Sequence, residues 1–314
     1  MLDISSNKAK QKLVVITGPT AVGKSALAIE MALHFGGEIL NADSMQVYRG
    51  MDVGTAKTPV GERRGVLHHL LDVVDPDEDF NAAIFRDLSL PVLAQTHARG
   101  KIGFVVGGTG LYIKTLLGGL LYCPDPDPQL RSELHGICEQ EGPQVLHRQL
   151  QLMDPESAER IHPNDKVRII RALEIMHSAK ERLSSMMQRH GFKDRPFEVM
   201  KVCLDMQRED LYRRINARCA RMVEEGLIQE VEGLLEKGYA PQLRPMQSIG
   251  YRHAVQFLEG SWDLDAMISQ LQIDTRRYAK RQLTWFRADP EMIWLAPEAR
   301  GEIIHHIQAF LKRS

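Results

Sequence analysis

The sequence predicts an α/β protein with a parallel sheet at its core, an inserted helical module and long helices near the carboxyl terminus. The first observation is that short apolar runs alternate with helical patterns over residues 13–106, which favours a doubly wound parallel sheet. The second is a glycine-bounded loop between the first apolar run and the first helix. The third is a proline-punctuated change to helical patterns after Gly118.

Four apolar runs are the expected strands of the first part: 13–17 (LVVIT), 38–42 (EILNA), 70–74 (LLDVV) and 101–106 (KIGFVV). Helices are expected in SALAIEMALHF, directly after the glycine loop, and over residues 82–99. Ligands of such sheets bind beyond the carboxyl ends of the strands. The loops 18–25, 43–50 and 107–110 are therefore the expected site.

The second part of the chain follows a different pattern. CPDPDPQL interrupts the chain, and most residues from there to about residue 190 have helical patterns, broken at Asp154-Pro155 and His162-Pro163. Residues 197–205 predict a strand that returns to the sheet, and two long helices are expected over 211–237 and 264–287. We thus expect a first core part over residues 1–120, an inserted helical module over 121–195, and a return to the core over 196–314.

Residues 18–25, GPTAVGKS, fit the pattern G-x-x-x-x-G-K-[ST] between a strand and a helix. Glycines let backbone N–H groups close around phosphate oxygens, Lys24 adds a charge, and Ser25 can ligate Mg²⁺. The alternative is a chance match on a turn. The expected diphosphate or nucleotide loop is Gly18, Pro19, Thr20, Ala21, Val22, Gly23, Lys24 and Ser25, in a P-loop NTPase-like core.

A nucleotide hydrolase of this class also needs an acidic residue after an apolar strand to hold the metal and polarise water. The strand KIGFVV ends instead in Gly107-Gly108-Thr109-Gly110, which disfavours a motor or switch ATPase. Asp43 follows the second predicted strand and is a candidate general base for an attacking hydroxyl or amine. The alternative for Asp43, an Asx-turn or helix cap with Ser44, stays open.

Positive charge is concentrated in the second half of the chain. Residues 1–159 carry 14 basic and 20 acidic side chains, whereas residues 160–290 carry 23 and 18, which is compatible with a polyanionic partner. Arg214, Arg218 and Arg221 share one helix edge, beside an apolar stripe. The alternative for these arginines is a solvated helix face without a binding role.

In the last long helix, Arg277, Lys280, Arg281, Thr284 and Arg287 project to one side, and Tyr278, Trp285 and Phe286 face the other. A solvated helix face is the alternative for these charges as well.

Composition excludes several classes of protein. With 43% hydrophobic and 26% charged residues, the chain is typical of globular proteins, and no apolar run is long enough to cross a bilayer. The first dozen residues are polar, which argues against a secretory signal and for a cytoplasmic protein. The four cysteines form no CxxC pair, so we expect reduced core thiols and no zinc site.

Several segments, taken in order, resemble the bacterial tRNA dimethylallyltransferases: GPTAVGKS, NADSMQVYRGMDVGTAK, VVGGTGLY, HPND, QSIGYR and TRRYAKRQLTWFR. The resemblance covers nearly the whole chain and is far more specific than the P-loop alone. It implies transfer of a dimethylallyl group from dimethylallyl diphosphate to N6 of the adenosine 3′-adjacent to the anticodon, in tRNAs that read codons beginning with U. Diphosphate leaves, and Mg²⁺ assists.

The resemblance also implies roles for single residues. Lys24 and Arg218 neutralise charge on the leaving diphosphate, Ser25 lies near the metal, Asp43 takes a proton from the N6 amine, and Thr109 lies near the reacting groups. We expect a monomer, because one chain holds both halves of this site. The implied contacts with the tRNA anticodon stem-loop are Asp43, Ser44, Met45, Gln46, Thr109, Arg131, Val167, Arg168, Ile169, Ile170, Arg171, Gln247, Ser248, Ile249, Gly250, Tyr251, Arg252, Lys280, Arg281, Gln282, Leu283, Thr284, Trp285, Phe286 and Arg287.

Three other functions remain open at this point. In a small-molecule kinase, Asp43 would deprotonate a hydroxyl, but such an enzyme would not require the helical module or the basic helix. A prenyltransferase acting on free adenine nucleotides is closer to the favoured function. A nucleotide-dependent RNA-binding protein without enzymatic activity would not require the catalytic-type residues.

Overall fold

A computed structural model describes residues 10–125 and 127–313. Residues 1–9 of the polar amino-terminal segment and Pro126 of the proline-rich break lie outside the described residues. The chain divides into two compact units. The core unit contains the chain up to Leu117 and from Arg195 onward, and the helical unit is Gly118–Asp194.

A six-stranded sheet of the core unit has the order β3-β2-β4-β1-β5-β6, with every pair parallel. Its strands are β1 (Gln11–Thr17), β2 (Glu38–Asn41), β3 (His68–His69), β4 (Gly103–Val106), β5 (Phe197–Leu204) and β6 (Met292–Leu295). In β1, which pairs with β4 and β5, Val14, Val15 and Ile16 are completely buried. The predicted α/β fold with a parallel sheet is confirmed.

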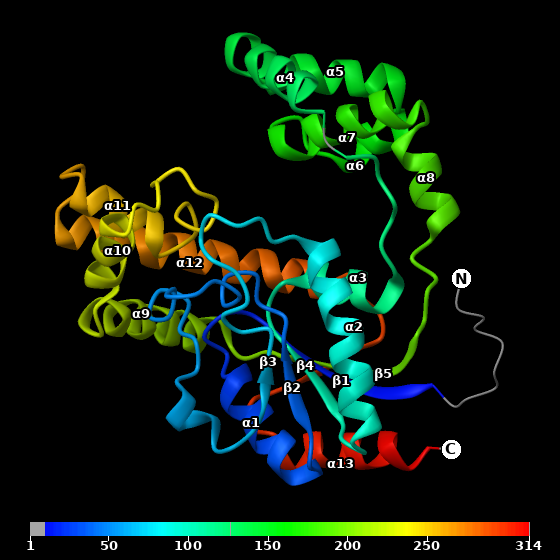
Figure 1. Cartoon of the computed structure of the whole chain (residues 1–314), viewed down its shortest axis with the longest axis vertical. Helices are drawn as coiled ribbons and strands as arrows, with labels where there is room; N and C mark the ends of the chain where they lie inside the picture. Colours follow the sequence, from blue (N-terminus) through cyan, green and yellow to red (C-terminus); the bar gives the residue numbers. More distant parts are fainter. Residues whose placement is uncertain (1–9, 126, 314) are drawn as a thin grey trace. The chain divides into compact units, whose positions relative to one another are not determined.

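Helices cover both faces of this sheet. Helix α1 (Lys24–Phe35) packs on β1, β2 and β4, and α2 (Ala82–Ala98) packs on β2 and β4. The connection from β1 to β2 passes β4 in one direction, and the connection from β3 to β4 passes β2 in the other. Since such crossovers are right-handed, α1 and α2 lie on opposite faces, and Figure 1 shows α2 in front of the strands. The short helix α3 (Gly110–Gly118) follows β4.

Most of the remaining core-unit helices form a group of their own (Figure 1). They are α9 (Arg208–Glu224), α10 (Leu227–Glu236), α11 (Tyr251–Leu258) and α12 (Leu264–Arg287), while a 3-10 turn (Val60–Arg63) precedes β3 and α13 (Arg300–Lys312) ends the described chain. Helix α12 packs against α9 and α11. Its buried stripe is Met267, Leu271, Thr275, Ala279, Gln282 and Phe286, at the spacing of one helix face.

Two elements differ from the prediction. The strand expected over 70–74 is wrong: β3 is only His68–His69, and Leu70 and Asp72 adopt positive φ angles of 59° and 56°, which a strand does not allow. The helix expected over 211–237 is two helices, because Gly226 between α9 and α10 has a φ of 103°. The helix over 264–287 is confirmed.

The helical unit contains α4 (Pro128–Glu141), α5 (Pro143–Met153), α6 (Pro155–Arg160), α7 (Lys166–Ala179) and α8 (Leu183–His190). Three of these helices begin at a proline, which suits the first helical position because its missing N–H would have no partner there. Leu146, Leu150 and Ile169 are completely buried in a separate apolar core. This core indicates that the unit packs as a small helical domain.

None of the helices within residues 10–125 and 127–313 is both long and apolar enough to span a membrane. All four cysteines are free. Cys138, Cys203 and Cys219 are buried, as predicted for core thiols, whereas Cys123 is only partly buried.

Candidate active site

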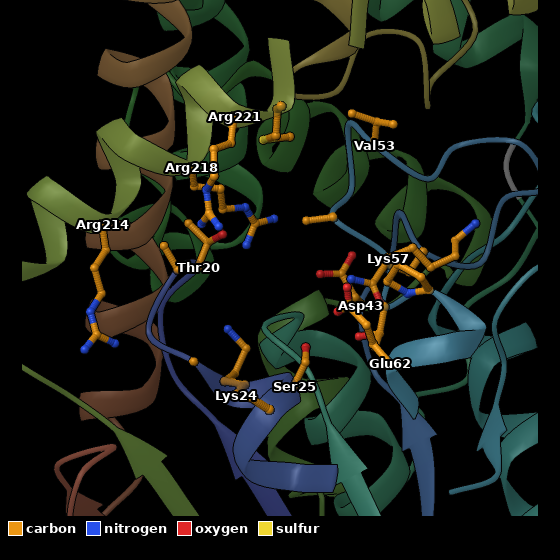
Figure 2. A pocket seen from close by; sticks show the side chains of 18 of the residues that line it. Thr20, Lys24, Ser25, Asp43, Val53, Lys57, Glu62, Arg214, Arg218 and Arg221 are labelled. Carbon is orange, nitrogen blue, oxygen red and sulfur yellow. The ribbon is translucent and has the colours of Figure 1, made fainter. Parts of the chain in front are cut away.

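A cavity of about 900 Å³ opens in the core unit. Four stretches of chain line it: the loop after β1 together with the first turns of α1, residues 43–64 after β2, helix α9, and helix α12. Figure 2 shows Lys24 and Ser25 at the start of α1, three arginines on the side of α9, and Asp43 on the opposite side. The cavity therefore brings together residues from four distant parts of the sequence.

The loop after β1 has the backbone conformation of a phosphate loop. Gly18, Ala21 and Gly23 have positive φ angles of 139°, 66° and 102°. A Cβ atom on Gly18 would lie 2.5 Å from the backbone oxygen of Leu204 at the end of β5, so only glycine fits there. The loop thus lies directly against the neighbouring strand.

Lys24 folds back onto this loop. Its Nζ donates hydrogen bonds to the backbone oxygens of Gly18 (3.0 Å) and Pro19 (2.7 Å). Burial lowers the pKa of Lys24 to about 8; the charge of Arg218 acts in the same direction, and that of Asp43 opposes it. A bound anion would therefore strengthen the charged form of this lysine.

Arg214, Arg218 and Arg221 all line the cavity from α9. Arg214 is paired with Glu298, at 2.9 Å between Nη2 and Oε1. The Arg218 Nη2 donates a 3.3 Å hydrogen bond to the backbone oxygen of Thr55. Burial lowers the pKa of Arg218, and the charge of Asp43 opposes this shift. Arg218 is thus a poorly solvated cation that faces the cavity.

Asp43 shows the turn geometry that was its alternative role. Its Oδ1 accepts a 2.9 Å hydrogen bond from the backbone N–H of Met45, as in an Asx-turn. Its backbone N–H donates to Asn41 Oδ1 at 3.2 Å. The second carboxylate oxygen has no hydrogen bond to a residue that the structure describes, so Asp43 can hold the turn and still accept a proton in the cavity.

Thr109 connects two loops of the site and does not line the cavity. Its Oγ1 accepts a 3.0 Å hydrogen bond from the backbone N–H of Ser44, and its own N–H donates to the backbone oxygen of Ala42 at 3.1 Å. Thr109 therefore fixes the residues on either side of Asp43.

The residues present fit a Mg²⁺ ion bound together with a diphosphate. The described residues contain no group of three or more His, Cys, Asp or Glu side chains that could hold a metal. Mg²⁺ needs no such group in a phosphate site, because it keeps several waters and binds substrate oxygens beside one or two protein ligands. The Ser25 hydroxyl and the Asp43 carboxylate both line the cavity and are of the required type.

Sequence reasoning did not include Tyr278 and Lys57 in the site, although both line the cavity. Burial and the charge of Asp43 raise the pKa of Tyr278. The Lys57 Nζ donates to the Tyr48 backbone oxygen, 2.8 Å away, and contacts the carboxylates of Asp52 and Asp72. Tyr278 could have been found from the sequence, because it is an aromatic residue on a basic helix. Nothing in the sequence marks Lys57, because the residues that it contacts come from separate loops.

The residues predicted to bind RNA are distributed over both units. Arg131 and 167–171 belong to the helical unit, where Arg131 Nε lies 2.5 Å from the buried carboxylate of Glu174. The others belong to the core unit.

The predicted RNA contacts differ in exposure. On α12, the exposed ones are Lys280, Arg281, Thr284, Trp285 and Arg287. We expected Trp285 and Phe286 on the same apolar side of the helix, but Trp285 is 47% exposed whereas Phe286 is buried. The side chains of Ile169, Ile170, Tyr251, Gln282 and Phe286 are buried, so RNA contacts in these segments must come from their neighbours.

Comparison with known proteins identifies the family. The model of the family described as IPP transferase matches residues 46–289, and that described as isopentenyl transferase matches residues 11–72. The tRNA dimethylallyltransferase 2 of Geotalea uraniireducens is 49% identical over 96% of this chain and 97% of its own length. The tRNA dimethylallyltransferase of Geobacter sulfurreducens is 49% identical over 95% of this chain and 96% of its own length.

Solved structures agree. The tRNA isopentenylpyrophosphate transferase of Bacillus halodurans is 41% identical, covers 96% of this chain and 97% of its own, and superposes with a TM-score of 0.72. A eukaryotic dimethylallyltransferase acting on tRNA is 30% identical, with a TM-score of 0.78, over 95% of this chain and 77% of its own. Since the family model spans most of the chain and relatives match it almost end to end, the chain belongs to the IPP transferase family, with the bacterial tRNA dimethylallyltransferases.

Proposed function

We propose that this protein transfers a dimethylallyl group from dimethylallyl diphosphate to N6 of the adenosine 3′-adjacent to the anticodon, in tRNAs that read codons beginning with U. One observation carries the proposal: a single cavity is lined by a phosphate loop, by the poorly solvated Arg218 and by the Asp43 carboxylate. In the reaction, the bond between C1 of the dimethylallyl group and the diphosphate oxygen breaks, and a bond from C1 to N6 forms. The N6 proton goes to Asp43, and diphosphate leaves.

The phosphate loop and two cations act on the leaving group. Backbone N–H groups of Gly18–Ser25 would bind the diphosphate oxygens, as glycine-rich loops before a helix do. Lys24 and Arg218 would stabilise the negative charge that grows as the C1–O bond breaks. This lowers the barrier because the charge on the leaving oxygen is larger in the transition state than in the bound substrate. The Ser25 hydroxyl would hold Mg²⁺ beside the diphosphate, and the ion would supply further charge neutralisation.

Asp43 would act on the nucleophile. Its turn geometry holds one oxygen on the Met45 N–H and leaves the other for the N6 proton. Thr109 would keep Asp43 in place through its hydrogen bond with Ser44. An amine inside a stacked loop cannot reach a carboxylate in a cavity, so the adenosine must be turned out of the anticodon loop.

The RNA would dock on exposed basic side chains. Lys280, Arg281 and Arg287 on α12 are exposed and can contact phosphates without regard to sequence. We assign the helical unit, with Arg131 and Arg168, to the same task, as the inserted tRNA-binding module. We further propose that the protein acts on tRNA as a monomer and that it does so in the cytoplasm.

The test uses purified protein, Mg²⁺ and labelled dimethylallyl diphosphate with one of three acceptors: an unmodified anticodon stem-loop, AMP, or ATP. Label in the stem-loop, at the adenosine 3′ of the anticodon, is the expected result. Label in AMP alone would replace the RNA acceptor with a free nucleotide. ATP turnover without prenyl transfer would make the protein a kinase or ATPase and overturn the proposal.

A further inference from the structure

Gln282 lies on the basic helix α12, and yet only 5% of it is exposed. Its Oε1 accepts a 2.8 Å hydrogen bond from the backbone N–H of Thr20, in the phosphate loop. Its Nε2 donates a 3.1 Å hydrogen bond to the backbone oxygen of Gly108, in the loop after β4. One amide therefore joins two loops that are far apart in the sequence.

The approach at Gly108 is close. A Cβ atom on Gly108 would lie 2.1 Å from Gln282 Nε2, so a larger residue there would displace the amide. The next residue, Thr109, accepts the Ser44 N–H at 3.0 Å, and Ser44 adjoins Asp43. A continuous path of short contacts thus runs from the phosphate loop, through Gln282 and Thr109, to the turn that holds Asp43.

We propose that Gln282 is a positioning residue that sets the spacing between the phosphate loop and the Asp43 turn. The inference rests on the proposed function, in which these two loops hold the two reacting partners. The donor is held at the phosphate loop and the proton acceptor is Asp43, so a small change in their spacing changes the distance between C1 and N6. A misplacement of about 1 Å can slow an enzyme roughly 100-fold.

The two partners of Gln282 require an amide. Thr20 offers an N–H donor and Gly108 offers a carbonyl acceptor, so the bridging group needs an acceptor and a donor on one fork. An ionised glutamate would place an oxygen against the Gly108 carbonyl, and methionine would fill the space without either hydrogen bond. A protonated glutamic acid restores both, because its carbonyl oxygen accepts and its O–H donates.

The first experiment measures steady-state kinetics of Gln282→Met and of Gln272→Met, a matched control on the same helix and outside the cavity. The acceptor is the stem-loop, and the wild-type protein is assayed alongside. For Gln282→Met we expect kcat to fall about 10- to 100-fold, with the KM for RNA within about twofold of wild type, because both polar atoms of the amide are already held by backbone groups. The control variant should match wild type.

Other outcomes of this experiment overturn the inference. A raised KM for RNA with unchanged kcat would make Gln282 an RNA contact. A lowered melting temperature with both constants unchanged would make it a purely structural residue. If the wild-type protein itself transfers no label to the stem-loop, the proposed function fails, and this result is distinct from any difference between wild type and variant.

The second experiment measures how the activity of a glutamate variant depends on pH. The activity of Gln282→Glu, divided by that of wild type at each pH, should rise as the pH falls and the new carboxyl group takes up a proton. The same ratio for Gln282→Met should stay flat. The double variant Gln282→Met, Thr109→Ala should be no slower than the slower single variant, because both changes break the same path. A flat ratio for Gln282→Glu, or fully additive losses, would overturn the inference.

Discussion

The Tyr251 hydroxyl donates a 2.5 Å hydrogen bond to the carboxylate of Glu230, which also accepts the backbone N–H groups of Asp52, Val53 and Gly54 at 2.8 to 3.0 Å. Four donors from two distant segments thus converge on one side chain. The ring of Tyr251 lies so near Gly54 that a Cβ atom there would be 2.4 Å from it. Tyr251 therefore supports the wall of the cavity from inside the protein.

Replacing Glu230 with glutamine should loosen this wall. The amide nitrogen of glutamine would face N–H donors, so we expect a loss of about 1 to 3 kcal/mol in the free energy of unfolding. Thr55, which follows this loop, accepts a hydrogen bond from Arg218, so kcat/KM for dimethylallyl diphosphate should fall as well. Chemical denaturation and initial rates measure the two effects. Glu232→Gln, on an exposed position of the same helix, is the control, and equal values for both variants would refute this role.

Lys24 predicts a pH dependence of donor binding. Its pKa is about 8, below the ordinary value of 10.5, chiefly because of burial. Above pH 8 the free protein loses this charge, so the KM for dimethylallyl diphosphate should rise by roughly tenfold per pH unit. Wild type should therefore take up more protons than Lys24→Arg on binding inorganic diphosphate at pH 9, whereas the two proteins should not differ at pH 7. Calorimetry in two buffers of different ionisation enthalpy measures the uptake, and equal uptake at pH 9 would contradict the lowered pKa of Lys24.

The same residue affects stability in the opposite direction. The unfolded chain holds the Lys24 proton up to about pH 10.5, whereas the folded protein releases it near pH 8. Between these values the unfolded state binds more protons, so the contribution of Lys24 to the free energy of unfolding rises with pH. Comparing wild type with Lys24→Met by denaturation at pH 7 and pH 10 isolates this contribution. A difference between the two proteins that does not change with pH would contradict the lowered pKa.

Asp43→Asn separates the two roles of this residue. Asparagine keeps an oxygen for the Met45 N–H and so preserves the turn, but it cannot take up a proton. We expect kcat to fall by about 10² to 10⁴, with the melting temperature close to that of wild type. Single-turnover rates with the stem-loop measure the loss. Asp77→Asn, at an exposed position outside the cavity, is the control. Intact single-turnover rates in Asp43→Asn would exclude Asp43 as the base.

The exposed basic residues of α12 should affect RNA binding only. Replacing Lys280, Arg281 and Arg287 by alanine should raise the KM for the stem-loop and flatten its salt dependence, by up to about one unit of the logarithmic slope for each phosphate that is no longer neutralised. The value of kcat at saturating RNA should stay near that of wild type. Lys101→Ala, at an exposed position just before β4, provides the control. An unchanged salt dependence would show that these side chains lie outside the RNA interface.

The sequence predicted those parts of the fold that depend on local patterns. Buried parallel strands are nearly continuous apolar runs, so β1 and β4 stand out, and β5 is still recognisable although Glu198 and Lys201 interrupt it. The strand β3 cannot be recognised in this way, because its two residues are histidines and form a strand only by pairing with β2. The apolar LLDVV run beside it is irregular in the structure. The break between α9 and α10 depends on one glycine, Gly226, which a helical pattern tolerates.

In the candidate site, too, only the residues that belong to local patterns could be predicted. Lys24, Ser25 and Asp43 were identifiable because a loop motif and the end of a strand define their positions. Gln282 and Glu230 were not identified in their structural roles, because their partners are backbone groups of distant loops, and a backbone N–H leaves no trace in the sequence. The resemblance places Gln282 among the RNA contacts with the rest of its helix, and in the structure its side chain is buried.

The two ends of the helical unit lie beside each other: a Cβ atom on Gly118 would be 2.9 Å from the backbone oxygen of Phe192. For the core unit, the insertion is therefore equivalent to a tight turn between α3 and β5, whatever its length. The entropic cost of closing this loop is offset by packing within the insertion rather than by contacts with the sheet. The helices between these two points can therefore change in number or length without any change in the strand order around β1.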